Sequence, residues 1–377
     1  MQNDNKLKVL VMTNEYLPKI IGGLGIVATH LSIALSQNGV EVTVLCTGNS
    51  NQLTISKPND NLRILRFPKS TRYFHRTKQS FKAKAILNTV SSKGFTKPDI
   101  IHVHSTDFAD TAKLAKARFH VPIVYSCHSM ASQGALSAPG KNQTKLIRSA
   151  SRIIVPSKWQ IGATRRRYPN TNINKFSVIP HGVKPGTSQS MAAPTNLLYV
   201  GRLIPSKGVD VLIRAIGLLS RTHKDVRLTI VGSGLISYQR KIRALTRQMG
   251  LTKRIRWVKK SKYGAVQRMY TSYGAVIVPS KKESFCLVAL EAMANGVPLV
   301  STLSGGLKEF VNDQNAQIIS TVNSSEIARA IKAFWNNPSL TKNRVRNAHS
   351  TAARYNWSTI TLQYESLFTN LNKVEGQ

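Results

Sequence analysis

The hydrophobic positions of the chain form short apolar runs that alternate with longer segments of helical periodicity. Residues 7–13 (LKVLVMT) are almost continuously apolar, which predicts a buried parallel strand. Residues 25–39 carry apolar side chains at helical spacing, and Asn38-Gly39 ends that segment. Residues 40–46 (VEVTVLC) are the next predicted strand, which completes a β-α-β unit. The same alternation continues to residue 183.

A second alternating series begins at residue 196 (NLLYVGRL), after a stretch rich in Pro, Gly, Ser and small residues that is typical of a linker. Strands separated by helices predict parallel sheets with helices on both faces. We therefore expect an α/β protein with two doubly wound, Rossmann-like domains. The expected segments are 1–185, 186–355 and a C-terminal helix, 356–377, that packs on either domain, the N-terminal one being the expected partner.

Charge adds a second constraint, because 54 Lys and Arg stand against 16 Asp and Glu and give a formal net charge of +38. Residues 61–98 and 112–209 contain no acidic side chain. Such a field attracts nucleic acid, anionic lipid headgroups or phosphorylated substrates, and charge alone leaves these partners open. The cations lie within folded segments and are not interleaved with aromatic residues, which disfavours a base-stacking surface.

The remaining composition indicates a protein of the cytoplasm. No apolar run is long enough to cross a bilayer, and the N-terminus lacks the apolar core of a secretory signal. Cys46, Cys127 and Cys286 are widely spaced beside apolar segments, so we expect buried free thiols and no metal site. Peripheral attachment to the inner face of the cell membrane is the alternative location.

One candidate site follows the first strand of the second domain, in RLIPSKG. Arg202 and Lys207 are five residues apart in a loop that leads into a helix, for which Ser206 is a predicted N-cap. Two cations beside a helix N-terminus suit a diphosphate. The alternative is a pair of solvated charges in a chain rich in cations.

The stretch PSKKESFCLVALEAM, residues 279–293, places two carboxylates in an acid-poor region. The pattern predicts a strand before it and a helix from Phe285 onwards, so Glu283 and Glu291 would lie near one face about 12 Å apart. A carboxylate binds vicinal hydroxyls well, and the free amides from Ser284 to Leu287 can face a sugar or a phosphate. The alternative is that Glu283 complements the helix dipole and Glu291 is a surface residue.

In the first domain, Gly22 and Gly23 precede the first helix and permit close approach of a ligand to its N-terminus. The nearby G-x-G-x-x-A match does not follow a strand directly and has no acidic residue after the second strand, so a dehydrogenase is not expected. His128 ends a predicted strand and is a candidate functional residue, whereas His102 is interpreted as structural.

Taken together, eight motifs resemble the retaining glycosyltransferases of family GT4, which have the GT-B fold. The resemblance covers nearly the whole chain, and the E-x7-E element from Glu283 to Glu291 is its most specific part. In chain order the motifs are IGGLG, DIIHVHS, VYSCHS, IIVPS, VIPHGV, VGRLIPSKGVDVLIRAI, LTIVGSG and PSKKESFCLVALEAMANGVPLVST.

The resemblance implies a hexosyltransferase whose second domain holds a nucleotide-sugar donor. Arg202 and Lys207 would bind the diphosphate, Glu283 the donor-sugar hydroxyls and Glu291 the ribose. His128 would contact the donor sugar from the first domain, so the expected catalytic residues are His128 and Glu283. The other expected donor contacts are Gly22, Gly23, Ser284, Phe285 and Leu287.

The resemblance also implies that the anomeric configuration is retained, that neither a metal nor a cofactor is needed, and that the leaving phosphate assists deprotonation of the acceptor. A UDP-sugar is the expected co-substrate and a GDP-sugar the alternative. Related glycogen and starch synthases carry a Lys two residues before the Gly pair, where this chain has Ile20, with Lys19 one position away. A glucan-polymer synthase is therefore not expected.

The expected acceptor is a glycan, a lipid-linked sugar or a phosphorylated molecule. Residues 76–90 (RTKQSFKAKAILNTV) place Phe81, Ala85 and Ile86 at helical spacing beside several lysines, which predicts a helix lying on an anionic membrane. The alternative is that the charge serves solubility or a soluble phosphorylated acceptor. Two further functions stay open, a nucleic-acid-binding protein and a catalytically idle partner subunit.

Overall fold

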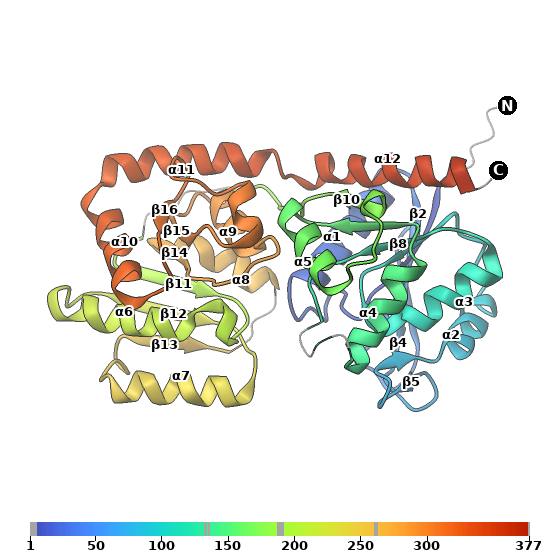
Figure 1. The fold of residues 1–377 in the computed structure, drawn as a ribbon, viewed down its shortest axis with the longest axis horizontal. Coiled ribbons are helices and arrows are strands. Elements are labelled where there is room, and N and C mark those ends of the chain that lie inside the picture. The colour runs from blue at the N-terminus through green and yellow to red at the C-terminus, as the bar shows by residue number, and fades with distance from the viewer. Residues whose placement is uncertain (1–5, 132–133, 135, 187–191, 260–262, 376–377) are drawn as a thin grey trace. The chain divides into compact units, whose positions relative to one another are not determined.

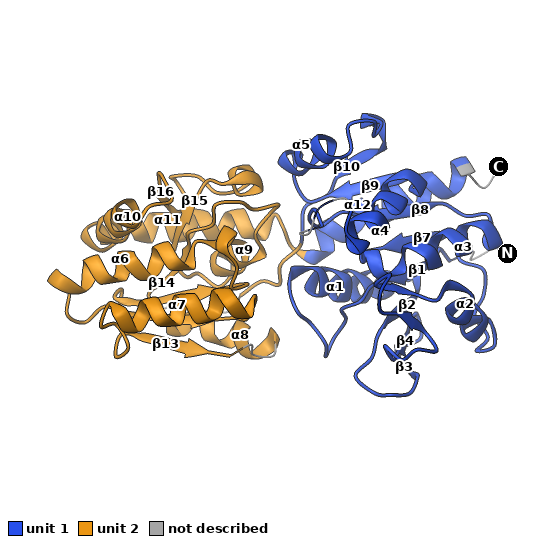
Figure 2. Ribbon diagram, turned by 60° about the horizontal axis from the view of Figure 1, so that its bottom comes forward, with its two compact units in different colours: residues 1–181, 357–377 blue, residues 182–356 orange. Residues whose placement is uncertain are grey.

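The computed structural model describes residues 6–131, 134, 136–186, 192–259 and 263–375, and the chain divides into two compact units (Figures 1 and 2). Unit 1 comprises residues 1–181 and 357–377, and unit 2 comprises residues 182–356. The sequence placed the corresponding boundaries at 185/186 and 355/356. The stretch 187–191 of the predicted linker lies outside the described residues.

Unit 1 is built on an eight-stranded sheet of order β10-β9-β8-β7-β1-β2-β4-β3, in which only β3 runs antiparallel to its neighbour. The central strands are apolar on both faces because helices cover both. The strands are β1 (Lys8–Met12), β2 (Glu41–Thr47), β3 (Thr54–Asn59), β4 (Leu62–Phe67), β7 (Ile100–Val103), β8 (Ile123–Ser126), β9 (Arg152–Val155) and β10 (Phe176–Val178), with a separate hairpin of β5 (Phe74–His75) and β6 (Ser80–Phe81).

The C-terminal helix of the chain belongs to unit 1. It packs on the first helix, and Asn38 at the end of that helix donates a 2.8 Å hydrogen bond to Glu365. The rings of Tyr364 and Phe368 reach the sheet, where they contact His102. The helices of this unit are α1 (Gly23–Gln37), α2 (Ala83–Ser91), α3 (Ala109–Phe119), α4 (Ala138–Ser149), α5 (Lys158–Arg167) and α12 (Trp357–Glu375), with 3-10 turns η1 (Thr106–Phe108) and η2 (Ile173–Lys175).

Unit 2 contains a six-stranded, all-parallel sheet of order β13-β12-β11-β14-β15-β16. The strand order reverses beside β11, so β11 and β14 flank the switch point where ligands bind in such sheets. The elements are β11 (Asn196–Val200), η3 (Pro205–Lys207), α6 (Val209–Thr222), β12 (Arg227–Val231), α7 (Ile236–Gln248), β13 (Ile255–Val258), α8 (Tyr263–Met269), η4 (Tyr270–Ser272), β14 (Ala275–Val278), α9 (Leu287–Ala294), β15 (Leu299–Thr302), η5 (Gly305–Glu309), β16 (Gln317–Ile319), α10 (Ser324–Asn336) and α11 (Pro338–Ala353).

The predicted membrane-facing helix is wrong in its extent and in its orientation, because α2 begins only at Ala83 and Phe81 lies in the short strand β6. Phe81 and Ile86 are 1% and 0% exposed, and Ala85 packs against the same core cluster. The Phe81 ring stacks on Phe108 at 4.3 Å between centroids. The apolar face of α2 is therefore part of the core of unit 1 and is not available to lipid.

We expect Phe81→Ala to lower the free energy of unfolding by about 3–5 kcal/mol, because it removes a buried ring and leaves a cavity. Chemical unfolding in urea measures this loss, and Lys84→Ala, an exposed change on α2, is the matched control. A loss below about 1 kcal/mol for Phe81→Ala would contradict its place in the core.

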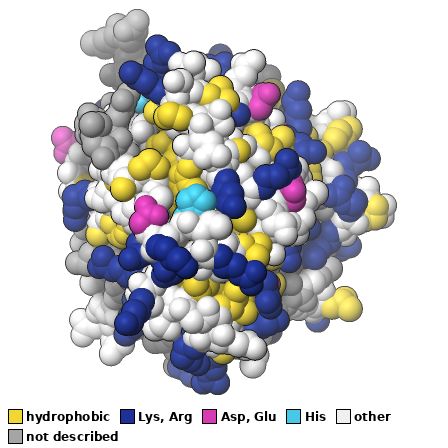
Figure 3. Space-filling model, turned by 90° about the vertical axis from the view of Figure 1, so that its left-hand side faces the viewer, with side chains coloured by type: hydrophobic (Ala, Val, Ile, Leu, Met, Phe, Trp, Pro, Cys, Tyr) yellow, Lys and Arg dark blue, Asp and Glu magenta, His cyan; other side chains and the backbone are white. Residues whose placement is uncertain are grey.

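Positive charge is shared by both units. Unit 1 carries 27 Lys and Arg against 9 Asp and Glu, and unit 2 carries 27 against 7. On the face drawn in Figure 3, Lys and Arg side chains lie across the surface and acidic side chains are few. The basic field is therefore not confined to the first unit. Within the described residues, no helix has the length and apolar character needed to cross a membrane.

Candidate functional site

The loops that follow the central strands of unit 2 bring Lys207 and Glu283 into direct contact. Lys207 Nζ lies 2.6 Å from Glu283 Oε1, and the Ser280 hydroxyl donates to the same oxygen at 2.8 Å. The two side chains are only 16% and 8% exposed. The sequence predicted both residues in separate roles but did not predict that they form one ion pair.

Close backbone packing holds this pair in place. A Cβ on Gly208 would lie 2.2 Å from the Pro279 carbonyl oxygen, and one on Gly305 would lie 2.0 Å from that of Glu283. Both glycines have positive φ, at +69° and +62°, so glycine is required there for two reasons. The loops after β11, β14 and β15 therefore meet through their backbones around Glu283.

The predicted helix around the second carboxylate starts later than expected. Helix α9 begins at Leu287, because its N-cap Cys286 has a φ of +93° that interrupts helical geometry. Glu283, Ser284 and Phe285 lie in the preceding loop, so the prediction that both carboxylates share one helical face is wrong. The Phe285 side chain is 2% exposed and packs against Phe310, so only its backbone is left for a ligand.

One other local prediction changes in the same region. Ser206 is not the N-cap of α6, because η3 precedes the helix and Gly208 in the left-handed region is the cap. Arg202 lies in the same loop with an exposed side chain, while its carbonyl oxygen accepts a hydrogen bond from the Tyr199 hydroxyl at 3.1 Å.

Glu291 is buried in α9, with 3% of its surface exposed, so its interpretation as a surface residue is wrong. The Tyr270 hydroxyl donates a 2.6 Å hydrogen bond to its Oε2. Oε1 is also buried, and no hydrogen bond from the described residues satisfies it. Burial raises the pKa of the Glu291 carboxyl to about 7, and interactions with the side chains of Tyr270, Gln267 and Tyr263 oppose that shift.

The raised pKa of Glu291 predicts the sign of a pH effect on stability. Between its ordinary value of 4.5 and about 7, folded Glu291 keeps a proton that the unfolded chain has lost. Protonation of Glu291 therefore adds on the order of 3 kcal/mol to the free energy of unfolding at low pH. This contribution is lost as the pH rises to 7. The melting temperature should fall less between pH 5 and pH 7.5 in Glu291→Gln than in the native protein. Equal falls in the two proteins would contradict a raised pKa for Glu291.

In unit 1 a row of histidines lies at the carboxyl ends of β7 and β8. His104 Nδ1 and His128 Nε2 are 2.9 Å apart with their rings stacked, and His181 lies next to His128 with 5.3 Å between ring centroids. Burial lowers the pKa of His128 to about 4, and that of His104 well below its usual range. These imidazole rings are therefore neutral near pH 7. Each can donate one hydrogen bond and accept another without carrying a positive charge.

The glycine loop of unit 1 has an unexpected partner. Gly22 is the N-cap of α1 and Gly23 is its first residue, so the helix begins two residues before the predicted start at Gly25. The Glu15 carboxylate accepts hydrogen bonds through Oε2 from the amides of Ile21 at 2.7 Å and Gly22 at 2.9 Å. In this structure the Gly22 amide is therefore already satisfied from within the chain.

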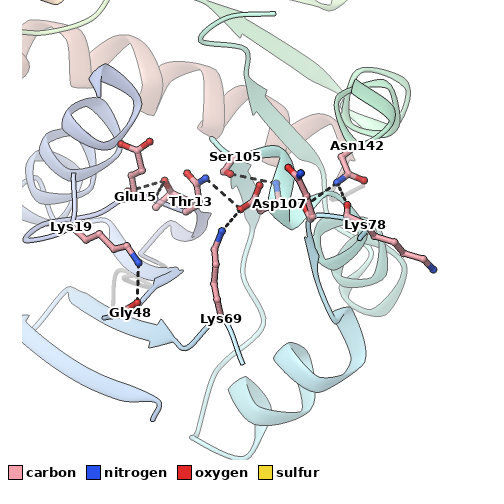
Figure 4. A network of polar contacts seen from close by, with 11 residues as sticks. Thr13, Glu15, Lys19, Gly48, Lys69, Lys78, Ser105, Asp107 and Asn142 are labelled. Carbon is pink, nitrogen blue, oxygen red and sulfur yellow. Dashed lines mark hydrogen bonds and ion pairs between the residues drawn. The ribbon is translucent and has the colours of Figure 1, made fainter. Parts of the chain in front are cut away.

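A polar network beside this loop was missed by sequence reasoning (Figure 4). Asp107, just after β7, lies 3.1 Å from Lys69 Nζ and accepts a 3.4 Å hydrogen bond from Asn14. Its amide is capped by the Ser105 hydroxyl. An acidic residue four positions after the end of a strand, in an acid-poor chain, was the available signal. Among the described residues, no group of three or more His, Cys, Asp or Glu is arranged to hold a metal ion.

Comparison with known proteins places two family models end to end on the chain. The model described as glycosyltransferase family 4 matches residues 21–186, and the one described as glycosyl transferases group 1 matches residues 189–351. A glycogen synthase of Mycobacterium tuberculosis is 27% identical, with 98% of this chain and 96% of the relative covered. A D-inositol 3-phosphate glycosyltransferase of Acidothermus cellulolyticus is also 27% identical, with 89% and 83% covered.

Solved structures agree with this match at the level of the fold. Sucrose-phosphate synthase from Thermosynechococcus elongatus superposes with a TM-score of 0.83 at 20% identity and covers 98% of this chain and 100% of its own. Anabaena HepE in complex with UDP and glucose gives a TM-score of 0.75 at 19% identity, with 96% and 99% covered. The prediction of a GT-B fold with two Rossmann-like units is confirmed.

Proposed function

Because this chain belongs to the GT4 glycosyltransferases and is a hexosyltransferase, we propose that it takes a hexose from a nucleoside-diphosphate sugar and retains its anomeric configuration. The observation that carries the proposal is the contact of Lys207 with Glu283 in the loops around β11 and β14. It joins a cation suited to a diphosphate with a carboxylate suited to sugar hydroxyls.

The nucleoside would bind near Glu291. Its buried Oε1 accepts no hydrogen bond of good geometry from the described residues, although the Tyr263 and Gln267 side chains interact with the carboxyl, and a buried carboxylate oxygen in that state is costly. A ribose hydroxyl supplies the missing donor. HepE was solved with UDP and glucose, and starch synthase IV of Arabidopsis thaliana with ADP and acarbose. We take a UDP-sugar as the donor, with a GDP-sugar as the alternative.

The diphosphate would be held by Arg202 and Lys207 without a metal ion. Lys207 is already oriented by Glu283, which in turn accepts a hydrogen bond from the Ser280 hydroxyl, so little reorganisation is needed when a phosphate oxygen arrives. Glu283 would accept hydrogen bonds from the donor sugar, the amide of Leu287 at the start of α9 would face the sugar or the phosphate, and the backbone of Ser284 and Phe285 in the preceding loop would lie beside them. His128 would contact the sugar as a neutral ring.

In the transfer itself, the bond between the anomeric carbon and the leaving phosphate oxygen breaks while the acceptor oxygen bonds to the same carbon on the same face. The acceptor hydroxyl gives its proton to the departing diphosphate, so no separate base is required. The two cations stabilise the charge that develops on that leaving group. The acceptor would be an anionic, phosphorylated or lipid-linked glycan, which the +38 net charge attracts.

If the two cations replace a metal, activity should survive a chelator. We expect hydrolysis or transfer of the donor sugar to continue at an unchanged rate in excess EDTA. Loss of activity that Mg²⁺ or Mn²⁺ restores would overturn the metal-free proposal while leaving the family assignment intact.

A ligand screen tests the donor proposal. UDP-, GDP- and ADP-sugars are compared by thermal stabilisation and by release of nucleoside diphosphate, in the native protein and in Arg202→Ala/Lys207→Ala. One donor should stabilise the native protein, and the double variant should lose the effect. Stabilisation by nucleic acid that persists in the double variant, with none by any nucleotide sugar, would favour the nucleic-acid-binding alternative.

A further inference from the structure

We propose that Glu15 is a positioning residue that holds the glycine loop before α1 in the form needed for transfer, an inference that rests on the proposed function. One carboxylate oxygen accepts hydrogen bonds from two successive amides, Ile21 at 2.7 Å and Gly22 at 2.9 Å. Charge-assisted bonds of this kind are about twice as strong as neutral ones. Glu15 therefore fixes the direction in which the chain enters α1.

The sequence reserves space for this contact at Gly25. A Cβ on Gly25 would lie 2.7 Å from Glu15 Cβ and 2.9 Å from Glu15 Oε2, and neither distance is tolerated without a shift. Gly25 is buried within the first turn of α1, where glycine weakens a helix relative to alanine. A glycine that destabilises the helix at this position is explained if the space beside it is needed for the Glu15 side chain.

Further bonds hold the base of the loop. The Thr13 hydroxyl donates to the Glu15 carbonyl oxygen at 2.9 Å, and Lys19 Nζ donates to the Gly48 carbonyl oxygen at 3.1 Å (Figure 4). The Leu17 amide donates to the Thr29 hydroxyl at 3.2 Å. Glu15 thus links a segment anchored to the sheet with the two residues that precede Gly23.

This arrangement changes which amide the loop offers to a ligand. The Gly22 amide is committed to Glu15, whereas the amide of Gly23, as the first helical residue, has no partner within α1. In the proposed function the Gly23 amide would then be the group presented to the reacting molecules. Loss of Glu15 frees the loop to rotate and misdirects that amide without touching the nucleotide-binding residues of unit 2.

Three variants test the role of Glu15. Glu15→Ala removes the acceptor, Glu15→Gln keeps an oxygen that can accept both hydrogen bonds, and Gly25→Ala displaces the carboxylate by steric contact. Glu41→Ala in unit 1 is the control for a lost carboxylate. Gly162→Ala in α5 is the control for an added methyl group, whose Cβ would meet only Arg166 at 3.5 Å.

We expect Glu15→Ala and Gly25→Ala to lower kcat at least tenfold with UDP affinity unchanged, and Glu15→Gln to stay within about threefold of the native protein. Amide hydrogen exchange in residues 13–24 should speed up in the first two variants only. A role confined to stability would lower the melting temperature while leaving kcat intact below it, and that result would overturn the proposal.

The exchange measurement separates this inference from the proposed function. If the native protein transfers no sugar but Glu15→Ala still loosens residues 13–24, the proposed function fails while the contact of Glu15 with the loop is upheld. If exchange is unchanged in Glu15→Ala, the positioning role is wrong whatever the donor.

Discussion

Lys207→Ala is expected to lower kcat by about 100- to 1000-fold, the range seen when one preorganised charge-stabilising donor is removed from an active site. Two effects act together. In the proposed function the leaving diphosphate would lose a cation, and Glu283, which is only 8% exposed, would be left without its ion-pair partner. Steady-state kinetics with saturating donor measure the change.

Lys253→Ala is the matched control, because Lys253 is an exposed lysine of unit 2 at the other end of its sheet, before β13. A double-mutant cycle with Glu283→Gln should be strongly non-additive, since the two residues share one contact. A decrease in kcat of less than threefold for Lys207→Ala would remove this lysine from the proposed site.

Glu291→Ala is expected to weaken binding of the nucleoside diphosphate by about 1.5–3 kcal/mol, which is roughly 10- to 100-fold in Kd. The reason is that the buried Oε1 accepts no hydrogen bond of good geometry from the described residues and would be satisfied by the ribose. Calorimetric titration with UDP measures the change, with Glu41→Ala in the other unit as the control. The same Kd in Glu291→Ala and the native protein would refute the ribose assignment.

The alternation of apolar runs was sufficient to predict the central strands of both sheets, because these strands are buried on both faces and carry few polar residues. It was not sufficient for β3, β4, β5, β6 and β16, which were not predicted as strands. Residues 54–59 are mostly polar, contain Lys57 and Pro58, and lie on an exposed edge, so they carry no core pattern. The strands at 74–75 and 80–81 are too short to show a period.

The candidate site was predictable only in part. Chain position relative to strands predicted the loops of Lys207 and Glu283, but no local pattern predicts a contact between residues 76 positions apart. The positive φ of Cys286 is a tertiary effect, so the helix start could not be read from the sequence. The burial of Glu291 did have a signal, because it is the one charged residue in LVALEAMA.

The predicted membrane-facing segment shows a further limit of sequence periodicity. Phe81, Ala85 and Ile86 have the spacing of an amphipathic helix, but periodicity does not distinguish a face that meets lipid from one that meets a protein core. The ring of Phe108, from a segment 27 residues later, settles the question by packing on Phe81. With that face covered, the proposed attraction to an anionic acceptor would rest on charge alone.

The most direct test of the central claim is a proton NMR time course of an α-linked UDP-hexose with the native protein, using water as acceptor when no other is known. The account predicts release of UDP together with hexose that first appears as the α-anomer, with Arg202→Ala/Lys207→Ala releasing neither. Hexose that first appears as the β-anomer would contradict retention. No release from UDP-, GDP- or ADP-hexoses, with or without added metal, would contradict the proposed donor.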